Sequence, residues 1–411
     1  MRKRLILAAA ICLAAAMPAH AADNGADCDR LAASPNDVNA TAPGVAFDDI
    51  DGPKAEAACR AALADSAGQP RFLFQLGRAL DREDRAEEAK AAYLAAGDAG
   101  YAPGYHGYGK LFELGIGGPT DYAKAATFYQ KALDAGMKYA AGDLAYLHEE
   151  GMGFDKDPAA AAPLYRVAAE AGDDWSQVHL GFLYEQGSGV KQDYAEALKW
   201  YGAAAEKGNT TGQYDLALMY RDGKGVPQSN EKAAELLTRS ANAGGALAAK
   251  ELARFYEYGT AGKTDPAEAE RLYRLAIDKG DGDEVWQSQN ELAWMLAHSG
   301  AGRLAEAEVL IAEALSKAPK DHADYGPALD TRAWIEHLQG KNDEALVTEL
   351  QAIDRDPAFP PFFDRLGDIY AALGKTAEAK AAWRKALELK MDDPSREPDW
   401  DRAAVEKKLA S

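Results

Sequence analysis

Glycine and other small residues recur along the middle of the chain with a period of 36 residues. The main series comprises Gly100, Gly136, Gly172, Gly208, Gly244 and Gly280. Other series at this period comprise Gly115, Gly151, Gly187, Gly223 and Gly259; Gly117, Gly153, Gly189 and Gly225, failing at Ala261; Asp121, Asp157, Asp193, Ser229 and Asp265; and Ala125, Ala161, Ala197, Ala233 and Ala269. Five registers of one period predict a solenoid of stacked repeats, because each unit buries its apolar face only against its neighbours.

The stretch from residue 173 to residue 208 shows how one unit folds. Leu180, Gly181 and Tyr184 have the spacing of one apolar face on a first helix. Gly187 follows them, and glycine ends a helix readily because the left-handed conformation costs it little. The stretch therefore begins with a helix that stops at Gly187.

A second helix is predicted in the same stretch. Asp193 is placed to cap its first turn, and Glu196 follows three residues later, as in a capping box. The apolar face of this helix comprises Ala197, Trp200, Tyr201, Ala204 and Ala205. Gly208 ends the helix, so the repeat is a helix pair whose small residues allow close packing.

These residues resemble the Sel-one-like repeat (SLR) family, whose pattern of Leu-Gly, Tyr, Gly-x-Gly-Val, Asp, Ala, Trp-Tyr and Ala-Ala appears from Leu180 to Gly208. The resemblance implies an all-α, right-handed solenoid of stacked antiparallel helix pairs that mediates protein–protein contacts. It also implies that some exported bacterial members restrain membrane sensor kinases or envelope polysaccharide production.

The period shortens to 34 residues after about residue 285, where Gly340 and Gly374 share a register. Leu366-Gly367, Tyr370 and Trp383 are similar to the tetratricopeptide repeat (TPR) pattern. We therefore expect the chain to divide into a signal peptide at 1–21, a disulfide-tied N-terminal cap at 22–68, a TPR-like unit at 69–100, five SLR repeats at 101–282, three TPR-like repeats at 283–394 and a C-terminal capping tail at 395–411.

The first 21 residues have the composition of a secretory signal. Arg2-Lys3-Arg4 precedes an apolar run from Leu5 to Met17, and Ala19-His20-Ala21 is a small-x-small cleavage site. The run is too short for a membrane anchor, which needs about 20 residues. We expect cleavage after Ala21, a periplasmic or secreted mature protein and no membrane insertion thereafter.

The two cysteines that follow the signal, Cys28 and Cys59, predict a disulfide, because an exported chain meets oxidising conditions. The formal net charge of −20 argues against nucleic acid and anionic membranes as partners, because both require a basic surface.

The sequence offers no motif for catalysis or for binding a cofactor. None of the histidines has zinc-ligand spacing, and no nucleophile elbow, P-loop or dinucleotide fingerprint is present. Acidic groups at Asp48-Asp49 with Asp51, and at Asp392-Asp393, lack the oxygen spacing of a calcium loop and are interpreted as solvated charge. We therefore expect no enzyme activity, no cofactor and no bound metal.

Three functions remain open at this point. The first is a periplasmic scaffold or regulator that binds a protein or peptide, such as a membrane sensor or an envelope protein. The second is a penicillin-binding or β-lactamase-like hydrolase of the cysteine-rich SLR type, which is disfavoured because residues 60–411 contain no cysteine. The third is a structural protein of the cell envelope.

In related helical repeats, residues two and five positions before and after the first-helix leucine point into the concave face. Applied to Leu144, Leu180, Leu216 and Leu252, this offset predicts a groove across the second to fourth repeats, with arginines that receive acidic groups of a partner. The alternative is that the rings, Tyr214 above all, pack against neighbouring repeats. The predicted groove residues are Tyr139, Tyr146, Glu149, Trp175, Phe182, Glu185, Tyr214, Leu218, Arg221 and Arg254.

Overall fold

The computed structural model describes residues 24–35, 37, 40–66, 69–260, 262–391 and 400–410. The expected signal peptide at 1–21, the departure at Ala261 and the pair Asp392-Asp393 lie outside these residues. The chain forms two compact units, Met1–Asp173 and Asp174–Ser411, and each is described by itself.

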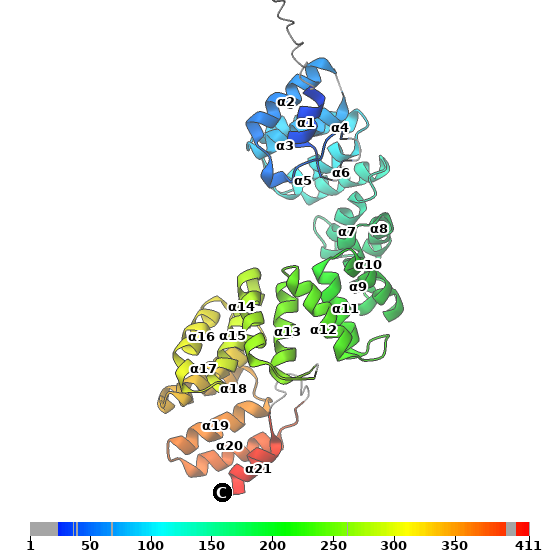
Figure 1. Cartoon of the computed structure of the whole chain (residues 1–411). Helices are drawn as coiled ribbons and strands as arrows, with labels where there is room; N and C mark the ends of the chain where they lie inside the picture. Colours follow the sequence, from blue (N-terminus) through cyan, green and yellow to red (C-terminus); the bar gives the residue numbers. More distant parts are fainter. Residues whose placement is uncertain are drawn as a thin grey trace, which may run out of the picture. The chain divides into compact units, whose positions relative to one another are not determined.

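The described residues form α-helices joined by short loops and contain no strand (Figure 1). The first unit comprises α1 (Asn24–Ala32), η1 (Phe47–Asp49), α2 (Gly52–Asp65), α3 (Pro70–Arg82), α4 (Ala86–Asp98), α5 (Ala102–Glu113), α6 (Tyr122–Asp134), α7 (Ala140–Glu150) and α8 (Pro158–Ala171). The second unit comprises α9 (Asp174–Gln186), α10 (Tyr194–Glu206), α11 (Thr210–Asp222), α12 (Asn230–Asn242), α13 (Ala246–Tyr258), α14 (Pro266–Lys279), α15 (Gly282–His298), η2 (Ala301–Arg303), α16 (Leu304–Lys317), α17 (Tyr325–Leu338), α18 (Asn342–Arg355), α19 (Pro360–Ala372), α20 (Thr376–Glu388) and α21 (Arg402–Ala410). Successive helices pack in antiparallel pairs within each unit, which confirms the predicted all-α solenoid architecture.

The loop inside each repeat is built in the same way. Gly187, after α9, is left-handed with φ of 69°, as are the other described glycines of its series. The side chain of Asp193 accepts hydrogen bonds from the first turn of α10, as predicted. The reciprocal bond of a capping box is not formed, because the Asp193 N–H donates to the carbonyl of Tyr184 (3.0 Å). Glu196 instead accepts from the indole of Trp200 (2.9 Å).

The 36-residue register ends where the glycine conformation changes. The five glycines from Gly100 to Gly244 have φ between 88° and 100°, whereas Gly280 has φ of −78°. The helix that follows, α15, has 17 residues, compared with 13 in α13. The longer first helix therefore marks the passage to the 34-residue period.

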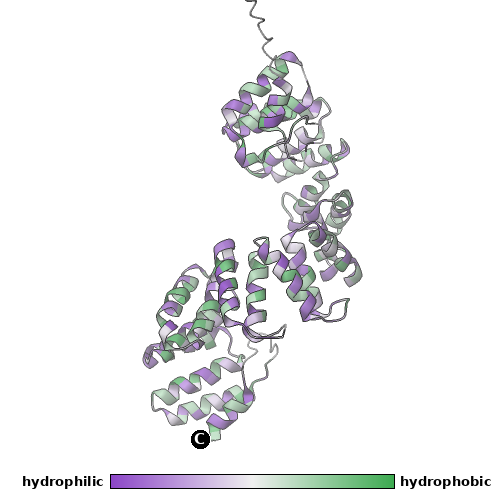
Figure 2. Cartoon of the chain, in the orientation of Figure 1, coloured by the Kyte–Doolittle hydropathy of each residue, from purple (hydrophilic) through white to green (hydrophobic). Residues whose placement is uncertain are grey.

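Small residues are required where the paired helices cross. A Cβ atom built on Gly181 would lie 2.7 Å from the ring of Tyr201, and one on Gly109 would lie 2.8 Å from the ring of Tyr129. Both tyrosines are fully buried. The buried positions of the helices are mostly apolar, and hydrophobic and hydrophilic residues alternate along each ribbon (Figure 2). The Gly–Tyr contact thus explains why a small residue stands at these two positions.

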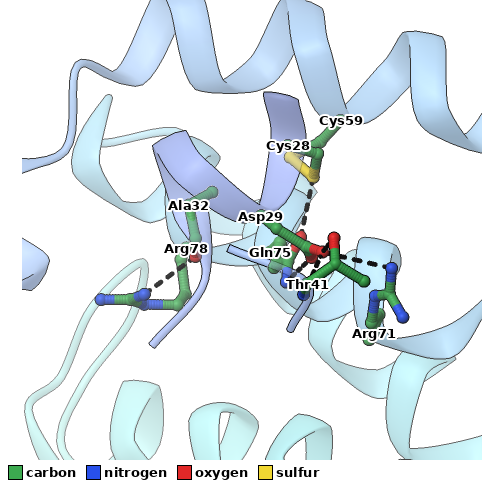
Figure 3. Close-up of a disulfide and its surroundings, with 8 residues drawn as sticks. All are labelled: Cys28, Asp29, Ala32, Thr41, Cys59, Arg71, Gln75 and Arg78. Carbon is green, nitrogen blue, oxygen red and sulfur yellow. Dashed lines mark hydrogen bonds and ion pairs between the residues drawn. A yellow bond between two sulfur atoms is a disulfide. The ribbon is translucent and has the colours of Figure 1, made fainter. Parts of the chain in front are cut away.

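The expected N-terminal cap contains two helices, α1 from Asn24 and α2 from Gly52. A disulfide joins Cys28 of α1 to Cys59 of α2 (Figure 3). The buried Asp29 carboxylate accepts hydrogen bonds from Thr41 (2.7 Å), Gln75 (2.9 Å) and Arg71 (3.2 Å). Polar contacts therefore attach the cap to α3 alongside the disulfide.

The expected C-terminal capping tail contains the short helix α21. Val405 is fully buried against α20. Lys408 Nζ lies 2.9 Å from the Asp364 carboxylate and 2.6 Å from that of Asp368, both on α19. These contacts cover the last helix pair.

Candidate protein-binding face of the first helices

The first helices of the second unit lie side by side. Each first helix from α9 to α17 contacts the first helix of the following repeat, and this row of helices ends at α19. We call the surface that they share the first-helix face. The predicted groove residues from Trp175 onward lie on α9, α11 and α13, whereas Tyr139, Tyr146 and Glu149 belong to the first unit.

A tyrosine of the second helix donates a hydrogen bond to a glutamate of the first helix in four repeats. The two residues are always 16 positions apart. The pairs are Tyr129 with Glu113, Tyr165 with Glu149 (2.6 Å), Tyr201 with Glu185 (3.0 Å) and Tyr273 with Glu257 (2.6 Å). This Tyr–Glu hydrogen bond joins the two helices of the repeat near the end of the first helix.

The fourth repeat replaces both partners of this bond at once. Leu237 occupies the tyrosine position and Arg221 the glutamate position. Arg221 instead forms ion pairs with Glu251 on α13 (2.6 Å) and with its neighbour Asp222 (2.7 Å). The fourth repeat therefore lacks both partners of the bond together and replaces it with ion pairs of Arg221.

The Tyr–Glu hydrogen bond changes the interpretation of two predicted groove residues. Glu149 is only 5% exposed and belongs to the interior of its repeat. Glu185 accepts the hydrogen bond from Tyr201 and also forms an ion pair with Lys224 (2.8 Å). Both carboxylates therefore hold helices together, and the offset rule that selected them did not take the second helix into account.

The two predicted arginines already face acidic groups of the protein. Arg221 is paired with Glu251 and Asp222. Burial alone would lower the pKa of Arg254, but the charges of Glu291 and Glu251 raise it above its ordinary value. These arginines are balanced by neighbouring carboxylates, which weakens the expectation that they receive acidic groups of a partner.

Three of the predicted aromatic residues are exposed. Trp175 and Phe182 on α9 are 40% and 46% exposed, and Tyr139 in the first unit is 49% exposed. The Trp175 ring lies against the His179 ring, with centroids 4.1 Å apart. The hydroxyl of Tyr139 donates to the carbonyl of Ala171 (3.1 Å). Large exposed rings of this kind are enriched in protein-binding surfaces.

The remaining predicted apolar residues are half-buried. Tyr146 lies on α7, and Leu218 and Tyr214 lie on α11. Tyr214 packs against the core of the second unit. Burial and the charge of Glu251 raise the pKa of Tyr214 to about 12, so its hydroxyl stays neutral at physiological pH. For Tyr214 the packing alternative therefore describes the geometry.

One carboxyl on α11 has an unusual electrostatic environment. Burial and then the charge of Glu185 raise the pKa of Asp215 to about 7. A comparable carboxyl in the first unit, Asp143, behaves oppositely. Burial alone would raise its pKa, but His106 (2.9 Å) and Lys110 (2.8 Å) lower it to about 2. Cationic neighbours thus decide which of these acids stays charged.

A row of four rings on α15 and α17, in which two contacts are stacked and the Trp294–His298 contact is tilted by 52°, was missed by the sequence analysis. We call Trp294, His298, Trp334 and His337 the aromatic ledge. The successive ring centroids are 4.3 Å, 6.2 Å and 4.9 Å apart. Trp294 stands two positions after Leu292, so extending the offset rule to this leucine would have found it.

The described residues show neither a metal site nor a membrane-spanning segment. No three histidine, cysteine, aspartate or glutamate side chains among them are grouped to hold a metal ion. No helix within the described ranges is long and apolar enough to cross a membrane.

Sequence comparison matches two repeat families. The Sel1 repeat matches residues 102–137, 138–173, 176–209 and 210–245, and a tetratricopeptide repeat-like domain matches residues 248–411. The region expected to form a fifth SLR repeat thus falls mostly within the second match. Its helices α13 and α14 nevertheless keep the Tyr–Glu hydrogen bond of the earlier repeats.

Solved structures show the same architecture, and the comparison with curated proteins found no match. The protective antigen c5321 of uropathogenic Escherichia coli, which displays an SLR fold, is 25% identical with a TM-score of 0.64, over 87% of this chain and 76% of that one. A Sel1 repeat protein from Oxalobacter formigenes is 31% identical with a TM-score of 0.50, over 55% of this chain and 92% of that one.

Proteins built from these repeats are generally scaffolds for protein–protein interaction and are typically not enzymes. The register of the glycines, the helix pairs and the two family matches all agree on this architecture. The chain therefore belongs to the Sel1 repeat family and carries a tetratricopeptide repeat-like domain at residues 248–411.

Proposed function

We propose that this protein is an exported, non-enzymatic scaffold or regulator that binds a protein partner through its first-helix face. The observation that carries the proposal is the exposure of Trp175 and Phe182 on α9. The fold does not require large rings at these positions, because Leu180 and Leu183 of the same helix fill the core. Exposed aromatic anchors dominate the energetics of many protein interfaces.

The sequence supports a periplasmic or secreted location. The signal-like residues 1–21, with a cleavage site after Ala21, and the pair Cys28 and Cys59 both favour an exported protein. The partner would then be a protein of the same compartment, such as a membrane sensor or an envelope protein. The acidic character of the chain disfavours nucleic acid as a partner.

Cross-linking with mass spectrometry on the periplasm of the native host identifies the partner. Affinity and thermal stability are then measured for Trp175→Ala and Phe182→Ala. Val347→Ala serves as the control, because Val347 is also apolar and exposed but lies on the second helix α18. We expect both α9 variants to lose about tenfold or more in affinity while their melting temperatures are kept, and the control to bind normally.

Two alternatives give different results. A penicillin-binding or β-lactamase-like hydrolase would turn over nitrocefin, although the repeats lack the cysteine pairs of that SLR type. A structural envelope protein would sediment with peptidoglycan. Unchanged affinity in both α9 variants, or a loss that merely follows unfolding, would place the binding surface elsewhere.

A further inference from the structure

The aromatic ledge lies on the first-helix face and is made by two consecutive first helices. Trp294 and His298 are one turn apart on α15, and Trp334 and His337 are one turn apart on α17. The rings of His298 and Trp334 join the two helices, with an angle of 17° between their planes. His298 is exposed and the other three rings are half-buried. The ledge thus presents ring faces from two neighbouring helices and is most accessible at His298.

The polar groups around the ledge are mostly occupied by the protein itself. The guanidinium of Arg365, on α19, lies 5.0 Å from the centre of the Trp294 ring and is ion-paired with the buried Asp330. His298 Nδ1 donates to the carbonyl of Trp294 (2.9 Å). His337 Nδ1 lies 2.7 Å from the side-chain oxygen of Asn342. The positive charge of Arg365, which lies over the ledge, is therefore balanced by Asp330 within the protein.

One donor in the ledge is not used. The indole N–H of Trp334 is buried and has no hydrogen-bond acceptor among the described residues. A buried donor without an acceptor is unfavourable, so an acceptor that reached it would be held favourably. An acceptor on a bound ligand would fill this role.

We propose that the aromatic ledge binds a proline-rich peptide segment of a partner in the polyproline II conformation. This inference rests on the proposed function, because it names the partner chemistry of the same face. Proline rings pack flat on aromatic rings, and the polyproline II backbone leaves its carbonyl oxygens free to accept from an indole N–H. Its preset backbone also reduces the entropy lost on binding.

A carbohydrate is the other ligand that stacks on indole rings, and the ledge suits it less well. Sugar hydroxyls need several donors and acceptors at the ring edges to replace their hydrogen bonds with water. Here Arg365 and both Nδ1 atoms are already engaged within the protein. An uncharged peptide needs only the ring faces and the indole N–H of Trp334, so the peptide is favoured.

The test uses a fluorescein-labelled peptide of ten prolines and the purified mature chain, with binding followed by fluorescence anisotropy. We expect saturable binding with a Kd below about 100 µM, and none with a glycine–serine peptide of equal length. Trp334→Ala should weaken binding about 30-fold, and Trp334→Phe, which keeps a ring but removes the N–H, about fivefold. Leu350→Ala, at an exposed apolar residue of α18, should bind as the wild type does.

His298→Ala keeps the test valid if Trp334→Ala fails to fold, because His298 is exposed; it should weaken binding several-fold. Absence of decaproline binding, equal loss in Leu350→Ala, or binding of cellohexaose to the ledge in place of the peptide would overturn the proposal. If the ledge fails while a captured partner still depends on Phe182, only this inference is overturned. If capture does not depend on the first-helix face at all, the proposed function fails as well.

Discussion

Tyr165 on α8 donates a hydrogen bond of 2.6 Å to Glu149 on α7, and this bond joins the two helices of one repeat. The tyrosine is fully buried, and burial together with Glu149 raises its pKa above the ordinary value, so the hydroxyl remains a donor. We predict that Tyr165→Phe lowers the free energy of unfolding by about 1–3 kcal/mol, because a buried carboxylate loses a donor. Urea denaturation followed by circular dichroism measures the change.

Tyr139→Phe is the control for this prediction. Tyr139 also loses one hydrogen bond, to the carbonyl of Ala171, but it is exposed and water replaces the lost donor. Its effect should stay within about 0.5 kcal/mol. Equal effects of the two variants would show that the Tyr–Glu hydrogen bond adds nothing to the repeat.

The fourth repeat allows the coupling within this bond to be measured directly. We predict that Leu237→Tyr and Arg221→Glu are each destabilising alone. The first buries a hydroxyl without its partner, and the second removes the ion pairs with Glu251 and Asp222 and places a like charge beside them. In the double variant the two should couple favourably by about 1 kcal/mol, because the bond found in the other repeats can then form. A double-mutant cycle on unfolding free energies gives this number, and a coupling near zero would contradict the account.

The fold could be predicted from the sequence, whereas most of the candidate site could not. Gly187 and Asp193 determine the loop of a repeat through their own backbone and side-chain chemistry. The 36-residue spacing of these residue types was therefore sufficient to predict the loop and the helix pair. The role of Glu149 depends on a residue of the next helix, which a single-helix offset ignores. The joint replacement by Arg221 and Leu237 was the signal that could have shown it.

Asp215 provides a prediction on pH. Its pKa is raised from 3.8 to about 7 by burial and then by Glu185, so the folded state prefers the protonated carboxyl. This contribution to stability is fully present below about pH 4 and is lost as the pH rises through about 7. Asp215→Asn, which mimics the neutral form, should therefore be more stable than the wild type at pH 8, by on the order of 2–4 kcal/mol, and equally stable at pH 4. Thermal unfolding at both pH values provides the comparison; a difference that does not depend on pH would argue against it.

The disulfide leads to a prediction about the first unit alone. We expect exported protein to carry the Cys28–Cys59 bridge, and Cys28→Ser with Cys59→Ser to reduce the stability of this unit by about 3–4 kcal/mol. Reductant should destabilise the wild type but leave the double variant unchanged, which provides the control. Intact-mass analysis after alkylation reports the bridge itself, and two alkylated thiols in unreduced periplasmic protein would refute it.

Site-specific photo-cross-linking tests the central claim most directly, namely that a protein partner binds the first-helix face. A photoreactive phenylalanine analogue is placed at Phe182 on α9 or, as a control, at Val309 or Val347 on the second helices α16 and α18; all three side chains are exposed. After irradiation of the native host, we predict a covalent adduct with one protein from position 182 and none from the two controls. Adducts only from positions 309 or 347, or no adduct from position 182, would contradict the account.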